Sequence, residues 1–145
     1  MYIFIGIGII IITGFFLYLK KKQDELENDF KKRFSGKNIL LLDKHAEFIA
    51  QESDGFAQVR GLGYLVFTDE VLFFQRQLGN KVVLIPIHSI IQAGETRRLG
   101  GRSPGRTMLQ IKFKDNSGKN DSIALLVKEL SLWKKVIAGA IDKKT

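Results

Sequence analysis

The sequence predicts a small, mainly β domain of antiparallel strands closed by a C-terminal helix and preceded by a long apolar helix. Three observations support this fold class. No charged side chain occurs between residues 2 and 19. Several segments between residues 62 and 127 are short and rich in β-forming residues, and one alternates apolar and polar side chains as a half-buried strand does. After residue 130 the apolar side chains recur with the period of an α-helix.

Residues 1–19 have the composition of a single transmembrane helix. The eighteen uncharged residues from Tyr2 to Leu19 include seven isoleucines and three phenylalanines. As a helix they are about 27 Å long, close to the thickness of the hydrocarbon core of a bilayer. A signal peptide is not expected, because the segment lacks a basic start and a cleavage site of small residues. Basic residues follow the segment from Lys20 onward and none precedes it, so we expect the N-terminus outside and the C-terminal domain in the cytoplasm.

Residues 20–37 are predicted to form a juxtamembrane helical stalk. Leu26, Phe30 and Phe34 recur every four residues among charged side chains, and Ser35-Gly36 is a typical helix end. This apolar stripe has two interpretations: it packs on the C-terminal domain, or it lies in the lipid interface.

The charge and composition of the chain narrow its function class. The formal net charge of the 145 residues is +8, with seven basic and four acidic residues in the stalk. A basic excess suits anionic lipid or nucleic acid. The chain carries no nucleic-acid recognition motif, so no nucleic-acid partner is expected. There are no cysteines, which excludes disulfides and thiol catalysis.

The region after residue 38 reads as strands separated by turn signals. The predicted strands cover residues 62–68, 71–78, 81–87, 107–114 and 122–127. Gly79-Asn80 predicts a two-residue hairpin. No segment between the strands is long enough for a helical crossover, so the sheet should be largely antiparallel. The final apolar stripe, from Leu130 to Ile141, predicts a helix that closes one end of a barrel, with Trp133 in the core.

Two motifs lie in this strand region. The first is Gly61-x-Gly63-Tyr64-Leu65-Val66-Phe67-Thr68-Asp69-Glu70-x-Leu72-x-Phe74, and the second is Ile85-Pro86-Ile87-x-x-Ile90. The first resembles the second and third strands of a GRAM or bacterial pleckstrin-homology-like (PH-like) domain, and the second is similar to the next strand and bend. The resemblance covers about residues 38–142 and implies a seven-stranded, strongly bent β-barrel or sandwich capped by a C-terminal helix. It also implies binding of phosphoinositides, other acidic lipids or proteins, with no ligand residue carried over.

The candidate binding residues are four arginines in one predicted mobile loop: Arg97, Arg98, Arg102 and Arg106. Guanidinium groups suit phosphate, and the neighbouring glycines let backbone N–H groups approach an anion. The alternative interpretation is a solvated loop. His45 and Glu47 supply only two potential metal ligands, so no metal site is predicted. No catalytic residues and no cofactor are expected.

Together these features predict a transmembrane helix over residues 1–19, a stalk over 20–37 and a GRAM/PH-like domain over 38–145. The expected function is that of a non-enzymatic, single-pass membrane protein. Its cytoplasmic module binds acidic lipid headgroups or an adjacent membrane protein. The alternative is a non-catalytic assembly or scaffold subunit of a membrane complex.

Overall fold

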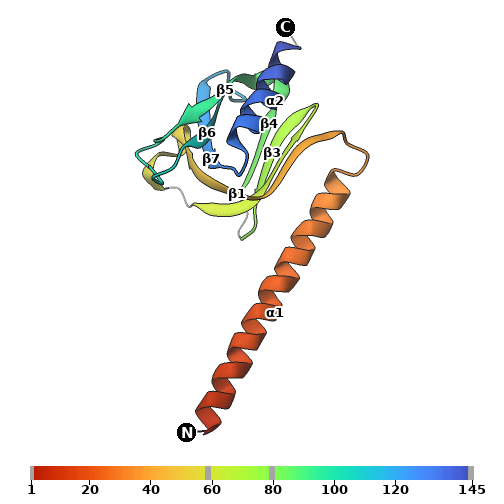
Figure 1. Ribbon diagram of the computed structural model, residues 1–145, viewed down its shortest axis with the longest axis vertical. Coiled ribbons are helices and arrows are strands. Elements are labelled where there is room, and N and C mark those ends of the chain that lie inside the picture. The colour runs from red at the N-terminus through yellow and green to blue at the C-terminus, as the bar shows by residue number, and fades with distance from the viewer. Residues whose placement is uncertain (1, 58–59, 79–80, 144–145) are drawn as a thin grey trace. The chain divides into compact units, whose positions relative to one another are not determined.

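The computed structural model describes residues 2–57, 60–78 and 81–143 (Figure 1). The chain forms two compact units, residues 1–36 and residues 37–145. The first unit is helical. The second contains every strand and the C-terminal helix.

The N-terminal unit is one uninterrupted helix, α1 (Tyr2–Arg33), which runs through most of the predicted stalk. Within it the rings of Phe30 and Phe34 contact each other, with centroids 5.0 Å apart. The last turn carries three basic residues, which favour the negative end of the helix dipole. Gly36, with φ of 74°, follows the helix in a backbone conformation that suits glycine.

The predicted transmembrane helix is not borne out. In the part of the chain that the structure describes, no helix is long and apolar enough to cross a membrane. This finding contradicts the anchor over residues 1–19, and with it the single-pass localisation and the placement of the C-terminal domain in the cytoplasm.

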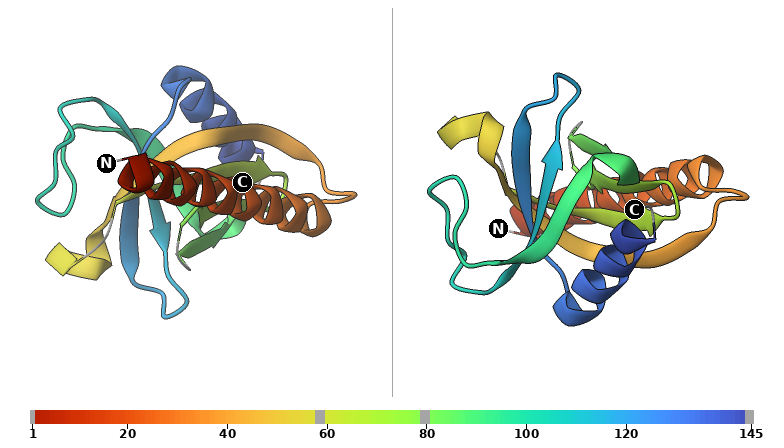
Figure 2. Two further views of the ribbon diagram at one scale, coloured as in Figure 1. Left: turned by 90° about the horizontal axis from the view of Figure 1, so that it is seen from below. Right: turned by 90° about the horizontal axis from the view of Figure 1, so that it is seen from above.

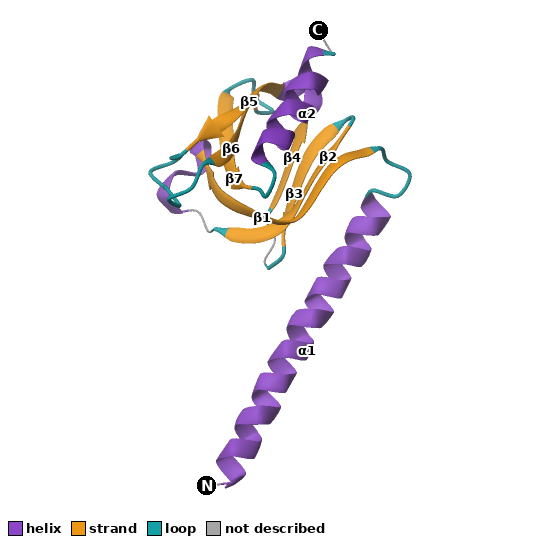
Figure 3. Ribbon diagram, in the orientation of Figure 1, coloured by secondary structure: helices purple, strands orange, loops and turns teal. Residues whose placement is uncertain are grey.

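The C-terminal unit is a seven-stranded antiparallel sheet with one long helix (Figure 3). Its strand order is β4-β3-β2-β1-β7-β6-β5. The elements are β1 (Ile39–Gln51), η1 (Glu52–Ala57), β2 (Gly61–Thr68), β3 (Val71–Arg76), β4 (Val82–Pro86), η2 (Ile87–Ser89), β5 (Ile90–Thr96), β6 (Met108–Lys114), β7 (Asn120–Leu126) and α2 (Leu130–Asp142). The five predicted strands are confirmed to within two residues at each end. The predicted hairpin at Gly79-Asn80 lies outside the described residues.

The strand β1, which sequence patterning missed, joins the two halves of the sheet. Its residues from Ile39 to Phe48 pair with β2, and those from Glu47 to Gln51 pair with β7. The pairing shifts register at three places along β1. Each irregularity bends the strand and interrupts the alternation of its side chains. The sheet can therefore fold over on itself, but the period of two is lost from the sequence.

The strand β5 was also missed, because its buried and exposed side chains do not alternate. It pairs only with β6, and most of its side chains are at least partly exposed. Partial exposure weakens the apolar pattern, and Gly94 further lowers the β propensity of the segment.

The core lies between the curved sheet and α2 (Figure 2). Trp133 is 2% exposed and packs there with Ile137 of the same helix. Leu109, Ile111 and Phe113 of β6 point into the same cluster, whereas Lys112 and Lys114 face out. The predicted faces of β6 and the predicted core position of Trp133 are confirmed.

Candidate functional site: a basic loop between β5 and β6

The four candidate arginines lie in the connection between β5 and β6, residues 97–107, called here the basic loop. The loop contains a tight turn. Leu99 N–H donates to the Arg102 carbonyl at 3.0 Å, and Arg102 N–H donates to the Leu99 carbonyl at 2.9 Å. The two residues between them, Gly100 and Gly101, have φ of 57° and 75°. A two-residue turn of this kind requires positive φ at both central positions, which glycine adopts without strain.

Two further contacts tie the basic loop to the domain. The Thr96 hydroxyl donates to the Arg98 carbonyl at 2.7 Å and accepts from Arg98 N–H at 3.3 Å. Leu99 is only 9% exposed and packs in a small apolar cluster with Ile49, Ala50, Met108 and Ala124. The sequence predicted a mobile loop, but packing of Leu99 holds the basic loop against the domain. Leu99, the one large apolar side chain between Thr96 and Thr107, was the signal that sequence reasoning missed.

The arginine side chains differ in their surroundings. Arg97, Arg98 and Arg106 are exposed, and Arg102 is half-buried. Across the described residues, no ion pair involves Arg97, Arg98 or Arg106. The nearest acidic residue in sequence, Glu95, pairs with Lys134 at 2.8 Å. The basic loop therefore presents positive charge that the described part of the domain does not neutralise.

The β1–β2 connection leaves the sheet on the same side as the basic loop (Figure 2). Two acidic side chains of this connection have partners within the domain. Asp54 pairs with Lys81 at 2.8 Å, and Glu52 accepts from the Ser122 hydroxyl at 2.9 Å. Neither of these acids forms a described ion pair with Arg97, Arg98 or Arg106.

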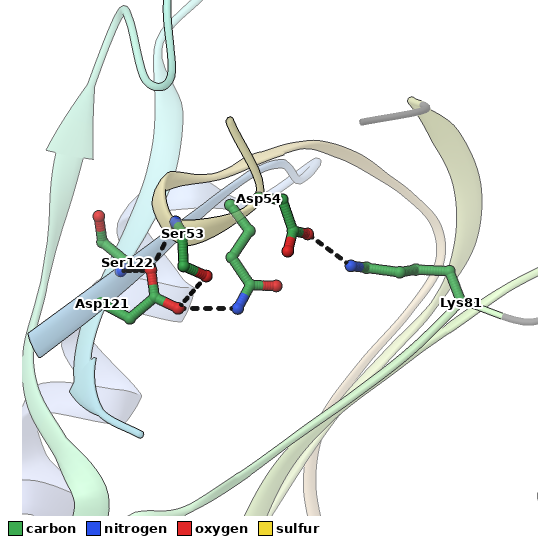
Figure 4. Close-up of polar contacts among 6 residues, drawn as sticks. Ser53, Asp54, Lys81, Asp121 and Ser122 are labelled. Atoms are coloured by element: carbon green, nitrogen blue, oxygen red, sulfur yellow. Dashed lines mark hydrogen bonds and ion pairs between the residues drawn. The ribbon is translucent and has the colours of Figure 1, made fainter. Parts of the chain in front are cut away.

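Asp121 fastens this connection to β7 (Figure 4). It is 6% exposed and accepts hydrogen bonds from the Gln51 amide, from the Ser53 hydroxyl and N–H, and from Ser122 N–H, at 2.7–3.1 Å. Burial alone raises the pKa of this carboxyl. The hydrogen bonds outweigh burial, so the pKa of Asp121 lies below its ordinary value.

The lowered pKa of Asp121 predicts a pH-dependent contribution to stability. Because the folded-state pKa is below the unfolded one, the contribution is present at neutral pH and is lost as the pH falls through the folded-state pKa. We expect Asp121→Asn to lower the free energy of unfolding by about 1–3 kcal/mol near neutral pH, since buried donors lose their acceptor. Urea unfolding of both proteins near pH 7 and near pH 3 measures the difference. An equal difference at both pH values would contradict the prediction.

Potential metal ligands do not converge in the structure. Among the described residues, no group of three or more histidine, aspartate or glutamate side chains is placed to hold an ion. Of the two residues considered from the sequence, His45 is exposed and Glu47 pairs with Arg60 at 2.9 Å.

Comparison with known proteins is informative at the level of the fold. No family model matches the chain, and no curated protein matches it. Solved structures are similar to the chain over most of its length, and three of them are described here. A chain of the 8S snRNP assembly intermediate has 10% identity and a TM-score of 0.57, over 72% of this chain and 83% of that one. The C-terminal domain of an unknown protein from Leishmania infantum has 14% identity and a TM-score of 0.54, over 79% and 96%. The Vps36 N-terminal PH domain has 13% identity and a TM-score of 0.53, over 74% and 81%.

The fold is PH-like. This agrees with the strand order, the bent sheet and the C-terminal helix, and it confirms the PH-like part of the resemblance drawn from the sequence. The narrower GRAM assignment has no matching family model. At these identities the likeness concerns the fold alone, so the ligand of the PH-like domain has to be argued from its own residues.

Proposed function

We propose that the PH-like domain is a non-catalytic binding module whose basic loop recognises the anionic headgroups of acidic lipids at a membrane surface. One observation carries the proposal. Arg97, Arg98 and Arg106 are exposed without an ion pair in the described structure, on a loop that Leu99 fixes to the domain. Guanidinium groups form paired hydrogen bonds with phosphate oxygens, and a fixed loop loses less conformational entropy on binding than a mobile one.

The expected affinity is modest. A basic residue near an anionic membrane surface contributes about 1 kcal/mol, so the three exposed arginines together contribute about 3 kcal/mol. That corresponds to a dissociation constant of about 6 mM for accessible lipid. The interaction is electrostatic, so it should weaken steeply as the salt concentration rises.

Binding to vesicles tests this proposal in the full chain. The parent should bind vesicles that contain phosphatidylserine more tightly than neutral phosphatidylcholine vesicles, and salt should reduce the difference. Replacing the four arginines with alanine should weaken binding to the acidic vesicles by at least about tenfold. The matched control replaces four exposed lysines on and after the β6–β7 hairpin, which changes the net charge equally: Lys112, Lys114, Lys119 and Lys128. Cosedimentation at several salt concentrations gives the binding curves.

Two results would overturn the proposal. One is equal binding of the parent to neutral and acidic vesicles. The other is an equal loss of vesicle binding in the arginine and lysine variants, which would mean that only net charge matters.

The alternative function is docking onto a protein. Guanidinium groups pair with carboxylates as well as with phosphates, so the exposed arginines also suit an acidic protein surface. Co-purification with the parent, and its loss in the arginine variant, would support docking.

A further inference from the structure

A groove runs along the other end of the domain, beside α2. It has a volume of about 690 Å³ and lies between α2, the start of β1, the β2–β3 turn and η2. Six of its lining residues are aliphatic or small: Leu40, Ile87, Leu132, Val136, Gly139 and Ala140. Leu40 and Leu132 are each 41% exposed, so apolar surface faces solvent here.

The groove has open space beside Gly139. A Cβ added at Gly139 would meet no atom within 4 Å. Glycine in the middle of a helix costs about 0.5–1 kcal/mol relative to alanine. Gly139 therefore lowers the stability of α2 and leaves free space in the wall of the groove.

The charges at the groove are mainly positive. Lys135 and Lys143 line it from α2 and make no ion pair among the described residues, whereas the adjacent Lys134 pairs with Glu95. The two lysines are about 12 Å apart along the helix axis. One acidic side chain, Asp69, lines the opposite side. An anion is therefore favoured along the helix side of the groove.

We propose that this groove binds a single acyl chain that carries an anionic headgroup, as in a long-chain fatty acid, with the headgroup at Lys135 or Lys143. The volume is within the range of about 300–1,000 Å³ that small-molecule sites occupy. An α-helix with its side chains is about 10–12 Å across, and a stable protein interface buries about 1,200 Å² or more. A groove of this size suits one flexible hydrocarbon chain better than a partner helix.

The length of the acyl chain and the charge of the headgroup can be tested separately by comparing the binding affinities of different ligands. Each methylene group that leaves water strengthens binding about fourfold. Palmitate should therefore bind more tightly than laurate, and it should bind more tightly than hexadecanol, which lacks the charge. Replacing both Lys135 and Lys143 with glutamine should weaken palmitate binding and leave hexadecanol binding nearly unchanged.

The test uses the full chain and the fluorescent fatty acid cis-parinaric acid, with palmitate, laurate and hexadecanol as competitors. Gly139→Leu fills the groove and should weaken binding by at least about tenfold, since loss of contact with two methylenes suffices. Ala138→Leu, at the adjacent exposed position, is the matched control and should change binding little. The helix α1 also exposes apolar side chains. Binding to α1 would not change in the Gly139→Leu variant, so a loss in that variant reports on the groove. Leu132→Gln should weaken binding without filling the groove. Thermal unfolding confirms that each variant is folded.

Several results would overturn the inference: absence of saturable binding, a folded Gly139→Leu variant that binds as the parent does, or equal competition by palmitate and hexadecanol. The groove and the basic loop are independent sites. Gly139→Leu should retain binding to acidic vesicles, and the four-arginine variant should retain palmitate binding.

Discussion

Replacing Trp133 with alanine should lower the free energy of unfolding by about 3–5 kcal/mol, the range for removing a large buried aromatic side chain. The indole is 2% exposed and belongs to the main core cluster together with Ile137 and residues of the sheet. Its removal leaves a cavity beneath α2, where the helix holds the curved sheet closed. Such a loss is a large fraction of the total stability of a small domain.

Far-UV circular dichroism during urea unfolding of the full chain measures this loss. Trp133 is the single tryptophan of the chain, so the variant has no tryptophan fluorescence to follow. Leu132→Ala is the control on the same helix, because Leu132 is 41% exposed and its truncation should cost less than about 1 kcal/mol. A loss below about 1 kcal/mol for Trp133→Ala would mean that α2 contributes little to the core.

Replacing Gly63 with alanine should destabilise the domain by about 3 kcal/mol, the upper end of the usual range for overpacking. Gly63 lies in β2 between β1 and β3. A Cβ there would collide with the backbone carbonyl of Gln75 and would come within 2.8 Å of the Phe74 ring. A backbone carbonyl in a paired strand cannot move aside without disturbing the ladder.

Gly61→Ala is the matched control, two residues away on the same strand. Its added Cβ would meet Cδ and Cγ of the Arg76 side chain, which can change rotamer, whereas a paired backbone carbonyl cannot move aside. We expect this variant to lose less than about 1 kcal/mol in the same urea experiment. If the two alanine variants were equally stable, the close approach of the β3 backbone at Gly63 would not be the reason for glycine at that position.

The sequence showed where the positive charge of the candidate site lies, but not how the basic loop is held to the domain. The four arginines are adjacent in the chain, so their concentration is visible without coordinates. The anchoring of Leu99 is not visible, because its partners come from β1, β6 and β7. The groove beside α2 was likewise outside the reach of sequence reasoning. Its walls come from segments about a hundred residues apart, such as Leu40 and Ala140.

By itself the sequence determined the strands and helix whose apolar period is regular. In β6 and α2 one face is buried and the other is solvated, so the alternation of side chains records the structure directly. Tertiary structure alone decided β1 and β5. Bulges in β1 break the alternation, and β5 exposes side chains on both faces. Such strands are specified by pairing with distant partners, and a local pattern in the chain cannot encode that pairing.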